Sequence, residues 1–367
     1  MKFTRLLLVM FLAGWAACFV TPTLIMAAED MGKEASASRT DFPQNVQLPL
    51  KVGVALKVNK LYTINELGNM FQADVDLRFR WQDPRVAFNK ADFGADRQEF
   101  SGAEAAAMLS KIWTPDIQVS NQSDKPQKEE KGLIIFMDGT VQYNLRLKGN
   151  FESTYNLDYF PFDTQRLMVN VTSLKYGSGK VLFEHLEVDD QYSGFESGLY
   201  LKGWQPERVN YQASQMKGWN GIPVSHIESA LEVKREWTAH LFNIYIPLAI
   251  LLAVPLIALG AIRQTWLVRI QMLTGAIMAY LTFSFATTIR YPALGVDSSV
   301  FHLIEYGFLF YLVVLVILLT VYNEHVYKPF MDRFVAVELH AYMKWSVPVF
   351  VVFGITALFL FSFLNLE

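Results

Sequence analysis

The segment FQADVDLRFRWQ, residues 71–82, alternates apolar and polar side chains without interruption. Because successive side chains of a β-strand point to opposite faces of the sheet, this period of two predicts a strand with one buried face. Residues 133–148 are typical of a hairpin, since Asp138-Gly139 separates an apolar run from a second alternating run. So many strands with few helical periods between them predict a β-sandwich that ends near Arg235. Further strand-like runs lie near residues 48–62, 166–172, 207–215 and 227–233.

The chain beyond residue 238 has a different composition. It carries only about a dozen charged residues, whereas 18% of the 367 residues overall are charged and 52% are hydrophobic. Four low-charge, apolar stretches of about 18 to 22 residues, the length that a helix needs to cross a bilayer, lie near residues 241–262, 270–289, 303–323 and 345–366. We therefore predict an all-β, immunoglobulin-like extracellular sandwich of about ten strands over residues 42–237, followed by an α-helical four-helix transmembrane bundle over residues 238–367.

The N-terminus has the features of an export signal. Two basic residues, Lys2 and Arg5, precede an apolar run that ends at Ala28. We predict a cleaved signal peptide over residues 1–28 and a polar lead over residues 29–41, with a retained anchor as the alternative because the apolar run is long. Both outcomes place the sandwich outside the cytoplasm, and four crossings return the C-terminus to the same side. Cationic residues gather in the first and third connections, where the positive-inside rule places cytoplasmic loops: Arg263, Arg269, Lys328, Arg333 and Lys344.

Several functional classes are disfavoured by what the sequence lacks. Its single cysteine, Cys18, lies in the N-terminal apolar run, so the exported part offers no disulfide and no cysteine-based zinc site. The six histidines show no His-x-x-x-His spacing, and a formal net charge of −3 without a basic run gives no electrostatic footprint for a nucleic acid. The exported part shows no Ser-His-Asp string, paired-carboxylate motif or glycine-rich phosphate loop. We expect neither a metal, nor a cofactor, nor an enzymatic activity.

The segment LDYFPFDTQ, residues 157–165, is the most specific string in the chain. Alone, its aromatic-Pro-aromatic-Asp core is compatible with a rigid turn in any sandwich. It closely resembles the Phe-Pro-Phe-Asp loop of the pentameric ligand-gated ion channels, the Cys-loop receptor family, whose bacterial members lack the disulfide that flanks this loop. The two cysteine positions of the family fall here on Ser153 and Leu167.

The resemblance continues in register over nearly the whole mature chain. Residues 81–83, WQD, resemble the family's Trp-x-Asp signature, and residues 113–116, WTPD, resemble its Trp-x-Pro-Asp. Arg235 lies where the family has an arginine before the first membrane helix, and Pro247 matches the proline within that helix. These anchors in order, followed by four spans, identify the chain as a member of this family without the disulfide.

The resemblance implies that the second span lines a pore with one stripe of its surface. The alternative is a helix packed among its neighbours. Gln271 would form a polar inner ring, and the large apolar members of the stripe would block conduction by dewetting. No acidic residue joins the stripe, so cation conduction is favoured only by analogy with the family, and anion passage stays open. The candidate pore-lining residues, which recur at spacings of three and four, are Gln271, Gly275, Met278, Thr282, Phe285 and Ile289.

The resemblance also implies a cluster that couples the sandwich to the membrane helices. An arginine between two carboxylates at this interface can exchange partners between two states. The alternative is a static ion-pair network that only holds the interface together. The candidate gating residues are Glu66, Phe160, Pro161, Asp163, Arg235 and Pro292.

The agonist site of the family lies between subunits and uses aromatic residues to surround a cation. Several of those positions are not aromatic in this chain: two loop positions are Ser120 and Leu174, and the second-strand position is Asp76. Asp76 and Arg78 lie on the polar face of their strand, which suits a charged ligand. The candidate ligand-binding residues are Asp76, Arg78, Ser120, Leu174, Tyr176, Tyr211 and Trp219.

We therefore expect a homopentameric ligand- or proton-gated ion channel of a bacterial inner membrane, with its N-terminal domain and C-terminus on the periplasmic side. Each chain would associate with four identical subunits and the lipid bilayer, and would pass inorganic ions, with cations favoured. A small amine, protons and an organic acid all stay open as the agonist. The alternative is a non-conducting membrane sensor whose sandwich binds a small ligand or a partner, although the short inner connections leave no domain to receive its signal.

Overall fold

The computed structural model describes residues 39–321 except 45, 262, 263, 296 and 297, together with residue 323 and parts of 335–353. The expected signal peptide and most of the expected polar lead lie outside the described residues. The fourth expected span, residues 345–366, is described only in part.

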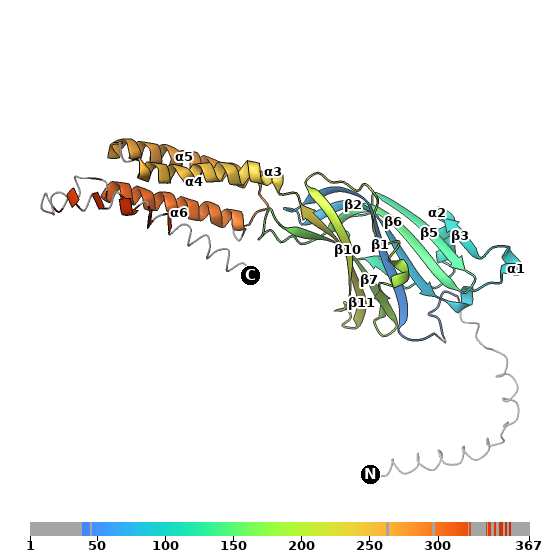
Figure 1. Cartoon of the computed structure of the whole chain (residues 1–367). Coiled ribbons are helices and arrows are strands. Elements are labelled where there is room, and N and C mark those ends of the chain that lie inside the picture. The colour runs from blue at the N-terminus through green and yellow to red at the C-terminus, as the bar shows by residue number, and fades with distance from the viewer. Residues whose placement is uncertain are drawn as a thin grey trace, which may run out of the picture.

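The strands between residues 50 and 235 form two sheets, which lie at one end of the molecule in Figure 1. Their bounds are β1 (Leu50–Asn65), β2 (Met70–Gln82), β3 (Arg97–Ser101), β4 (Ile117–Val119), β5 (Lys128–Phe136), β6 (Thr140–Glu152), β7 (Thr164–Gly177), β8 (Val181–Glu184), β9 (Gly194–Phe195), β10 (Trp204–Lys217) and β11 (Pro223–Arg235). The seven-stranded sheet has the order β3-β5-β6-β2-β1-β8, with β9 paired to β1, and the four-stranded sheet has the order β10-β11-β7-β4. The predicted sandwich is confirmed.

The strands predicted from alternation are present in the structure. The segment 71–82 makes up most of β2, which pairs antiparallel with β1 and β6. The predicted Asp138-Gly139 turn joins β5 to β6. Gly139 has a φ of +83°, and a Cβ there would lie 2.7 Å from the carbonyl oxygen of Asp83, so this turn needs glycine.

Short elements fill the connections between the long strands. They are the 3-10 turns η1 (Pro84–Val86) and η2 (Glu187–Asp189) and the helices α1 (Lys90–Phe93) and α2 (Gly102–Leu109). The sequence did not predict these elements or the strands β3, β4, β8 and β9. These strands have only two to five residues, and the longest of the helices has eight, which is about two turns and too short to show a clear period.

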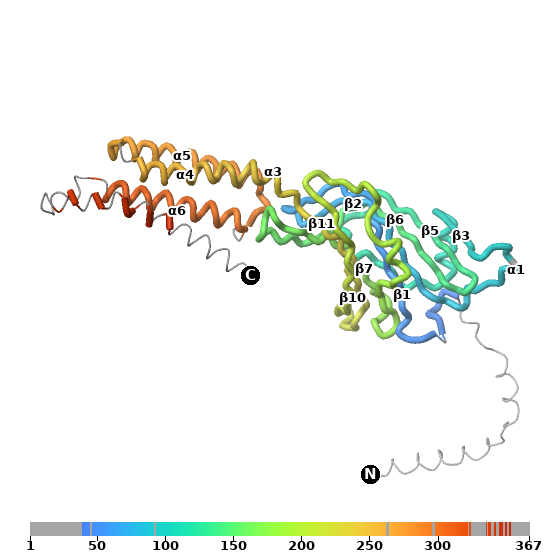
Figure 2. Tube along the Cα trace, viewed as in Figure 1, coloured from blue at the N-terminus to red at the C-terminus, as the bar shows by residue number. Residues whose placement is uncertain are grey.

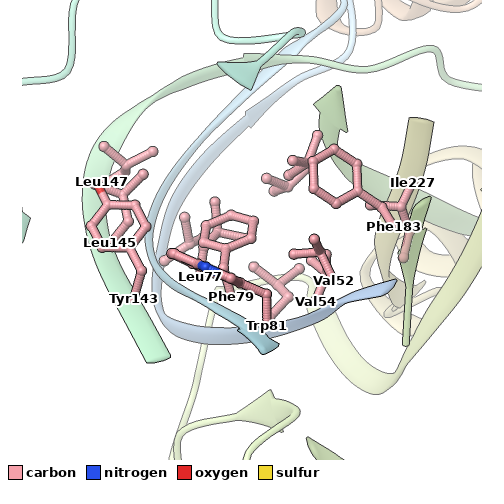
Figure 3. Close-up of a cluster of buried hydrophobic side chains, with 14 of the residues drawn as sticks. Val52, Val54, Leu77, Phe79, Trp81, Tyr143, Leu145, Leu147, Phe183 and Ile227 are labelled. Carbon is pink, nitrogen blue, oxygen red and sulfur yellow. The ribbon is translucent and has the colours of Figure 1, made fainter. Parts of the chain in front are cut away.

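The apolar residues of the alternating strands meet between the two sheets (Figure 3). Val54 of β1, Phe79 of β2 and Ile227 of β11 are fully buried in one cluster. Full burial of such a side chain stabilises the fold by about 1.5–3 kcal/mol. The polar residues of the same alternation, including Asp76 and Arg78, lie on the opposite face of β2, where they form ion pairs.

Beyond β11 the chain forms helices of membrane length. The first helical stretch combines α3 (Thr238–His240), a π-helical turn η3 (Leu241–Tyr245) and α4 (Ile246–Gly260); it is followed by α5 (Trp266–Arg290) and α6 (Ser299–Thr320). The side chains of Thr265 and Ser298 cap the N-termini of α5 and α6. All three stretches are long and apolar enough to cross a membrane. Their bounds lie within about one helical turn of the first three predicted spans.

The three helices run side by side, as the tube in Figure 2 shows, and each contacts the other two. Tyr280 of α5 and Tyr311 of α6 occupy the centre, where their hydroxyls donate to the carbonyl oxygens of Ile304 and Leu251 over 2.6 Å each. Gly307 makes room for this arrangement, because a Cβ there would overlap the Tyr280 hydroxyl. These contacts fix which face of α5 is turned inward.

Candidate functional site

The sandwich meets the helices through its loops and through the end of β11. The β6–β7 connection carries the Phe-Pro-Phe-Asp motif, the β1–β2 turn carries Glu66, and β11 ends at Arg235. The α5–α6 connection reaches the first of these loops, since the backbone N–H of Ser299 donates to the carbonyl oxygen of Asp158 over 3.2 Å. Sandwich and helices are therefore in direct contact.

Arg235 joins two of these loops through its guanidinium. Its Nε donates to Oδ1 of Asp163 over 2.7 Å, its Nη2 donates to Oδ2 of Asp163 over 2.9 Å, and Nη2 also donates to Glu66. The rings of Phe160 and Trp204 lie 4.7 and 4.2 Å from the guanidinium carbon. Burial by itself lowers the pKa of Arg235, but the hydrogen bonds and charges of Asp163 and Glu66 outweigh it and raise the pKa. The arginine therefore stays charged inside this joint.

The residues around this ion-pair cluster complete the interface. The side-chain amide of Gln165 donates to the Asp163 carboxylate and to the carbonyl oxygen of Asn156. Among the other predicted gating residues, Pro161 is buried, whereas Pro292 is exposed in the α5–α6 connection. The sequence predicted that Glu66, Asp163 and Arg235 would meet, and the structure brings them together; Trp204 and Gln165 were missed.

Phe160 packs into the end of the helix bundle that lies next to the sandwich. Its side chain is buried, and its ring lies 4.8 Å from His240 and 5.6 Å from Tyr291. Its carbonyl oxygen accepts hydrogen bonds from the hydroxyls of Ser299, over 3.2 Å, and Tyr245, over 3.4 Å. One loop residue of the sandwich thus contacts the starts of the first and third membrane helices and the end of the second.

A hydrogen bond closes the base of this loop at Ser153, one of the two positions that the resemblance assigns to cysteines. The hydroxyl of Ser153 donates to the carbonyl oxygen of Arg166 over 2.7 Å. Leu167, the second position, is buried in the sandwich core. The loop is therefore held at its base without cysteine.

The stripe predicted on α5 is exposed over its whole length in the single chain. Its three large apolar members, Met278, Phe285 and Ile289, are 66%, 68% and 80% exposed, and its three polar or small members are also exposed. The opposite face of α5 is buried through Leu273 and Tyr280. The Gln271 amide favours water or a further helix on this face, since hydrocarbon offers it no hydrogen-bond partner, and small residues such as Gly275 are typical of helix–helix contacts in membranes. The Thr282 hydroxyl donates to the carbonyl oxygen of Met278 within the helix.

Three of the predicted ligand-binding residues are exposed, and they lie in or next to the four-stranded sheet. Ser120 follows β4 and is exposed, and Leu174 of β7 is 38% exposed. Trp219, at the tip of the β10–β11 hairpin, is 88% exposed. Tyr176 differs from these, because its ring is buried in the core and its hydroxyl accepts a hydrogen bond from Nε1 of Trp113 over 3.0 Å.

The charged candidates on β2 are held by partners from distant parts of the chain. Arg146 of β6 donates to both carboxylate oxygens of Asp76, over 2.6 and 2.8 Å. Burial alone would raise the pKa of Asp76, but the hydrogen bonds and positive charge of Arg146 lower it. Arg78 pairs with the fully buried Asp189 over 2.8 Å, and its guanidinium lies 4.0 Å from the centre of the Tyr192 ring. Sequence reasoning did not identify Asp189, Tyr192 or Arg146 as partners of these residues, since none of the three belongs to a motif.

Tyr211, the last candidate, reaches from β10 to the other sheet. Its hydroxyl accepts from the backbone N–H of Leu56 over 2.8 Å and donates to the hydroxyl of Ser193 over 2.8 Å. Its ring stacks on His185. Tyr211 therefore connects the sheets within one subunit.

Replacing Asp189 with alanine is expected to destabilise the sandwich by up to about 3–5 kcal/mol, because the Arg78 side chain, which is only 13% exposed, would lose its ion-pair partner. Denaturant unfolding of the purified full-length protein, followed by far-ultraviolet circular dichroism, measures this. Lys90→Ala is the control, since its pair with Asp96 is exposed and should contribute less than about 1 kcal/mol. Equal stability of Asp189→Ala and the unmodified protein would contradict this role of the pair.

A sandwich whose loops pack directly against membrane-length helices defines a membrane protein in which a β-domain contacts the spans. The family model for the neurotransmitter-gated ion-channel ligand binding domain matches residues 37–237. The chain belongs to this family, the pentameric ligand-gated ion channels related to Cys-loop receptors, as the motifs predicted.

Individual relatives agree with this family. The chain is 22% identical over 272 residues to a proton-gated ion channel of Gloeobacter violaceus, an alignment that covers 73% of this chain and 72% of that protein. It is 27% identical over 155 residues to the gamma-aminobutyric acid receptor subunit pi of Rattus norvegicus and of Mus musculus, covering 41% of this chain and 33% of each of those proteins. The chain thus spans about a third of the length of these receptor subunits and groups with ion channels rather than with enzymes.

Proposed function

We propose that five copies of this chain form a cation-conducting channel in a bacterial inner membrane, with the sandwich and the C-terminus in the periplasm and α5 of each copy lining the pore. The exposed stripe on α5 carries this proposal. Arranging five copies around an axis turns the stripes of Gln271, Gly275 and Thr282 toward one another and away from lipid. The buried face of α5 then keeps its contacts with α4 and α6.

The chemistry of the stripe determines how the pore would conduct and close. Gln271 supplies amide oxygens at the inner end, which replace part of the hydration shell of a cation. Met278, Phe285 and Ile289 supply apolar rings that stop conduction by dewetting when the pore is narrow. The sequence of α5 contains no Asp or Glu, so cation preference would depend on amide and hydroxyl dipoles rather than on a ring of carboxylates.

The agonist is a proton or a small charged molecule that binds between adjacent sandwiches. Similarity to a proton-gated channel supports protons. Asp76 and Arg78 on one side, with Ser120, Leu174 and Trp219 on the other, supply charged and accessible groups for a small ligand. A conformational change caused by agonist binding would be transmitted to α5 through Phe160 and the cluster of Glu66, Asp163 and Arg235.

Current recording from purified protein in planar bilayers tests this proposal. With tenfold asymmetric KCl, a pH series and a panel of amines and organic acids, we expect currents that reverse toward the cation equilibrium potential. Native mass spectrometry of the same sample should give five subunits. Silence under every condition, despite an assembled oligomer, would contradict conduction, and reversal at the chloride potential would contradict cation preference.

A further inference from the structure

A histidine outside the predicted sites lies where the two sheets and a loop meet. His185 follows β8; its Nδ1 lies 2.9 Å from the carbonyl oxygen of Val54 on β1, and its Nε2 lies 2.6 Å from Oδ1 of Asp190. Its ring stacks on Tyr211 of β10, with ring centroids 3.8 Å apart and planes 3° from parallel. The imidazole thus contacts β1, β10 and the segment that follows η2 at once.

Both ring nitrogens of His185 face oxygen atoms that accept hydrogen bonds. A carbonyl oxygen carries no hydrogen, so Nδ1 must donate to Val54. An ionised Asp190 can also only accept, so Nε2 must donate as well, which makes the ring an imidazolium. If the carboxyl of Asp190 carries the proton instead, it donates to Nε2. In either arrangement the His185–Asp190 pair holds one proton more than a neutral histidine beside an ionised carboxylate.

Asp190 is the charged residue that hydrogen-bonds to the His185 ring. Tyr211 is protonated throughout the neutral range, because burial raises the pKa of its hydroxyl. Tyr192, on the same segment, contacts the guanidinium of Arg78. Asp190 is itself 67% exposed and pairs with His185. On the neighbouring elements Asp189 pairs with Arg78, Glu184 with Lys51, and Glu196 with Lys57. Glu187 of η2, Lys60 of β1 and Glu207 of β10 carry further charges, and all three residues are exposed.

We propose that His185 and Asp190 form a proton-binding site that fixes the segment 186–203 against β1 and β10. Protonation supplies hydrogen bonds at both ring nitrogens, to Val54 and to Asp190. Where the proton lies on the ring, it also places a cation on the face of the Tyr211 ring. Loss of the proton leaves one ring nitrogen facing an oxygen atom with no hydrogen between them, which removes one of the two hydrogen bonds and any positive charge on the ring. Histidine is the side chain whose ordinary charge change falls between about pH 5 and 8, so a comparison of pH values on either side of that range tests the site.

The strand β10 connects this site to the ion-pair cluster of Glu66, Asp163 and Arg235 at the interface with the helices. Tyr211 lies opposite Ser229 in the register of β10 with β11, and β11 ends at Arg235. A proton on the pair therefore stabilises one arrangement of the hairpin that leads to the cluster of Arg235 and Asp163. This last step rests on the proposed gating of the channel, whereas proton binding and the ordering of the segment do not.

Hydrogen–deuterium exchange of the full-length protein in detergent tests the site. We expect the backbone amides of residues 186–203 to be about tenfold more protected at pH 5.5 than at pH 8.0, after correction for the pH dependence of chemical exchange. His185→Gln can still donate to Asp190 but cannot change charge, and Asp190→Asn removes the carboxylate at an exposed position. In both variants the ratio of amide protection at pH 5.5 to that at pH 8.0 should fall below about twofold.

His226→Gln is the matched control, because His226 is also a largely buried histidine of the sandwich but its Nδ1 lies 2.9 Å from the hydroxyl of Thr172. It should keep the full pH-dependent difference. Equal protection of the unmodified protein at both pH values, or a difference that survives His185→Gln and Asp190→Asn, would overturn the proposal. Hydrogen–deuterium exchange does not depend on ion flow. The absence of current would therefore contradict only the proposed function, and the pH-dependent protection of residues 186–203 could still be measured.

Discussion

Replacing Arg235 with alanine is expected to reduce agonist- or proton-evoked current by on the order of 100-fold or more, while the oligomer still assembles. The guanidinium connects Glu66, Asp163 and the chain that enters the first membrane helix. Its removal leaves the buried Asp163 without its counter-ion, and breaking a buried pair in this way costs about 3–5 kcal/mol. The contacts of Phe160 within the bundle remain and hold the two parts together. Evoked current in bilayers and the mass of the assembly measure the two outcomes.

Arg208→Ala is the matched control for this substitution. Arg208 lies on the neighbouring strand β10, and its side chain is 70% exposed and pairs with Glu232 over 2.7 Å. Its loss should leave evoked current unchanged, since exposed pairs contribute less than about 1 kcal/mol. Normal gating by Arg235→Ala would contradict the coupling role of the cluster. Loss of assembly would show that the cluster is a static joint.

Replacing Phe285 with alanine is expected to raise the leak current of the resting channel on the order of tenfold, because in the proposed pore this side chain forms an apolar ring that keeps water out of the closed state. The side chain is 68% exposed in the single chain and has no role in packing α5 against α4 or α6. The fold should therefore be preserved. Current in the absence of agonist, normalised to the maximal evoked current, measures the leak.

Phe283→Ala provides the contrast on the same helix. Phe283 lies two residues away and packs against the buried cluster of the bundle. Its truncation should lower stability, since a cavity forms in the core, and should leave the leak low. A resting current in Phe285→Ala equal to that of the unmodified protein would exclude this ring as a barrier.

The sandwich could be predicted from the sequence because its long strands have one buried and one polar face. Alternation over residues 71–82 predicts β2 nearly to its ends. The same rule fails where a strand is irregular. Odd-numbered residues of β7 are buried as far as Val171, but the burial pattern then shifts, so that Tyr176 is turned into the core. A shift of one residue moves every later side chain to the other face, and no local signal marks it.

The ion-pair cluster between the sandwich and the helices was predictable for a different reason, namely that its residues belong to recognisable motifs. Glu66, Asp163 and Arg235 meet as expected. The pairs of Arg78 with Asp189 and of His185 with Val54 were not predictable, because their members lie more than 100 residues apart in the sequence and carry no periodic or motif signal. Side chains of this kind are found only once the sheets are assembled.

Cysteine accessibility on α5 tests the central claim, that its exposed stripe lines a conducting pore. Cys18 is the single cysteine of the chain, so Thr282→Cys and Thr287→Cys can each be made in a Cys18→Ser background. Thr282 lies on the exposed stripe, whereas Thr287 lies on the buried face of the same helix. We predict that a cationic methanethiosulfonate reagent alters the current of Thr282→Cys during activation and leaves Thr287→Cys unaffected. Block of Thr287→Cys with no effect on Thr282→Cys would contradict the account.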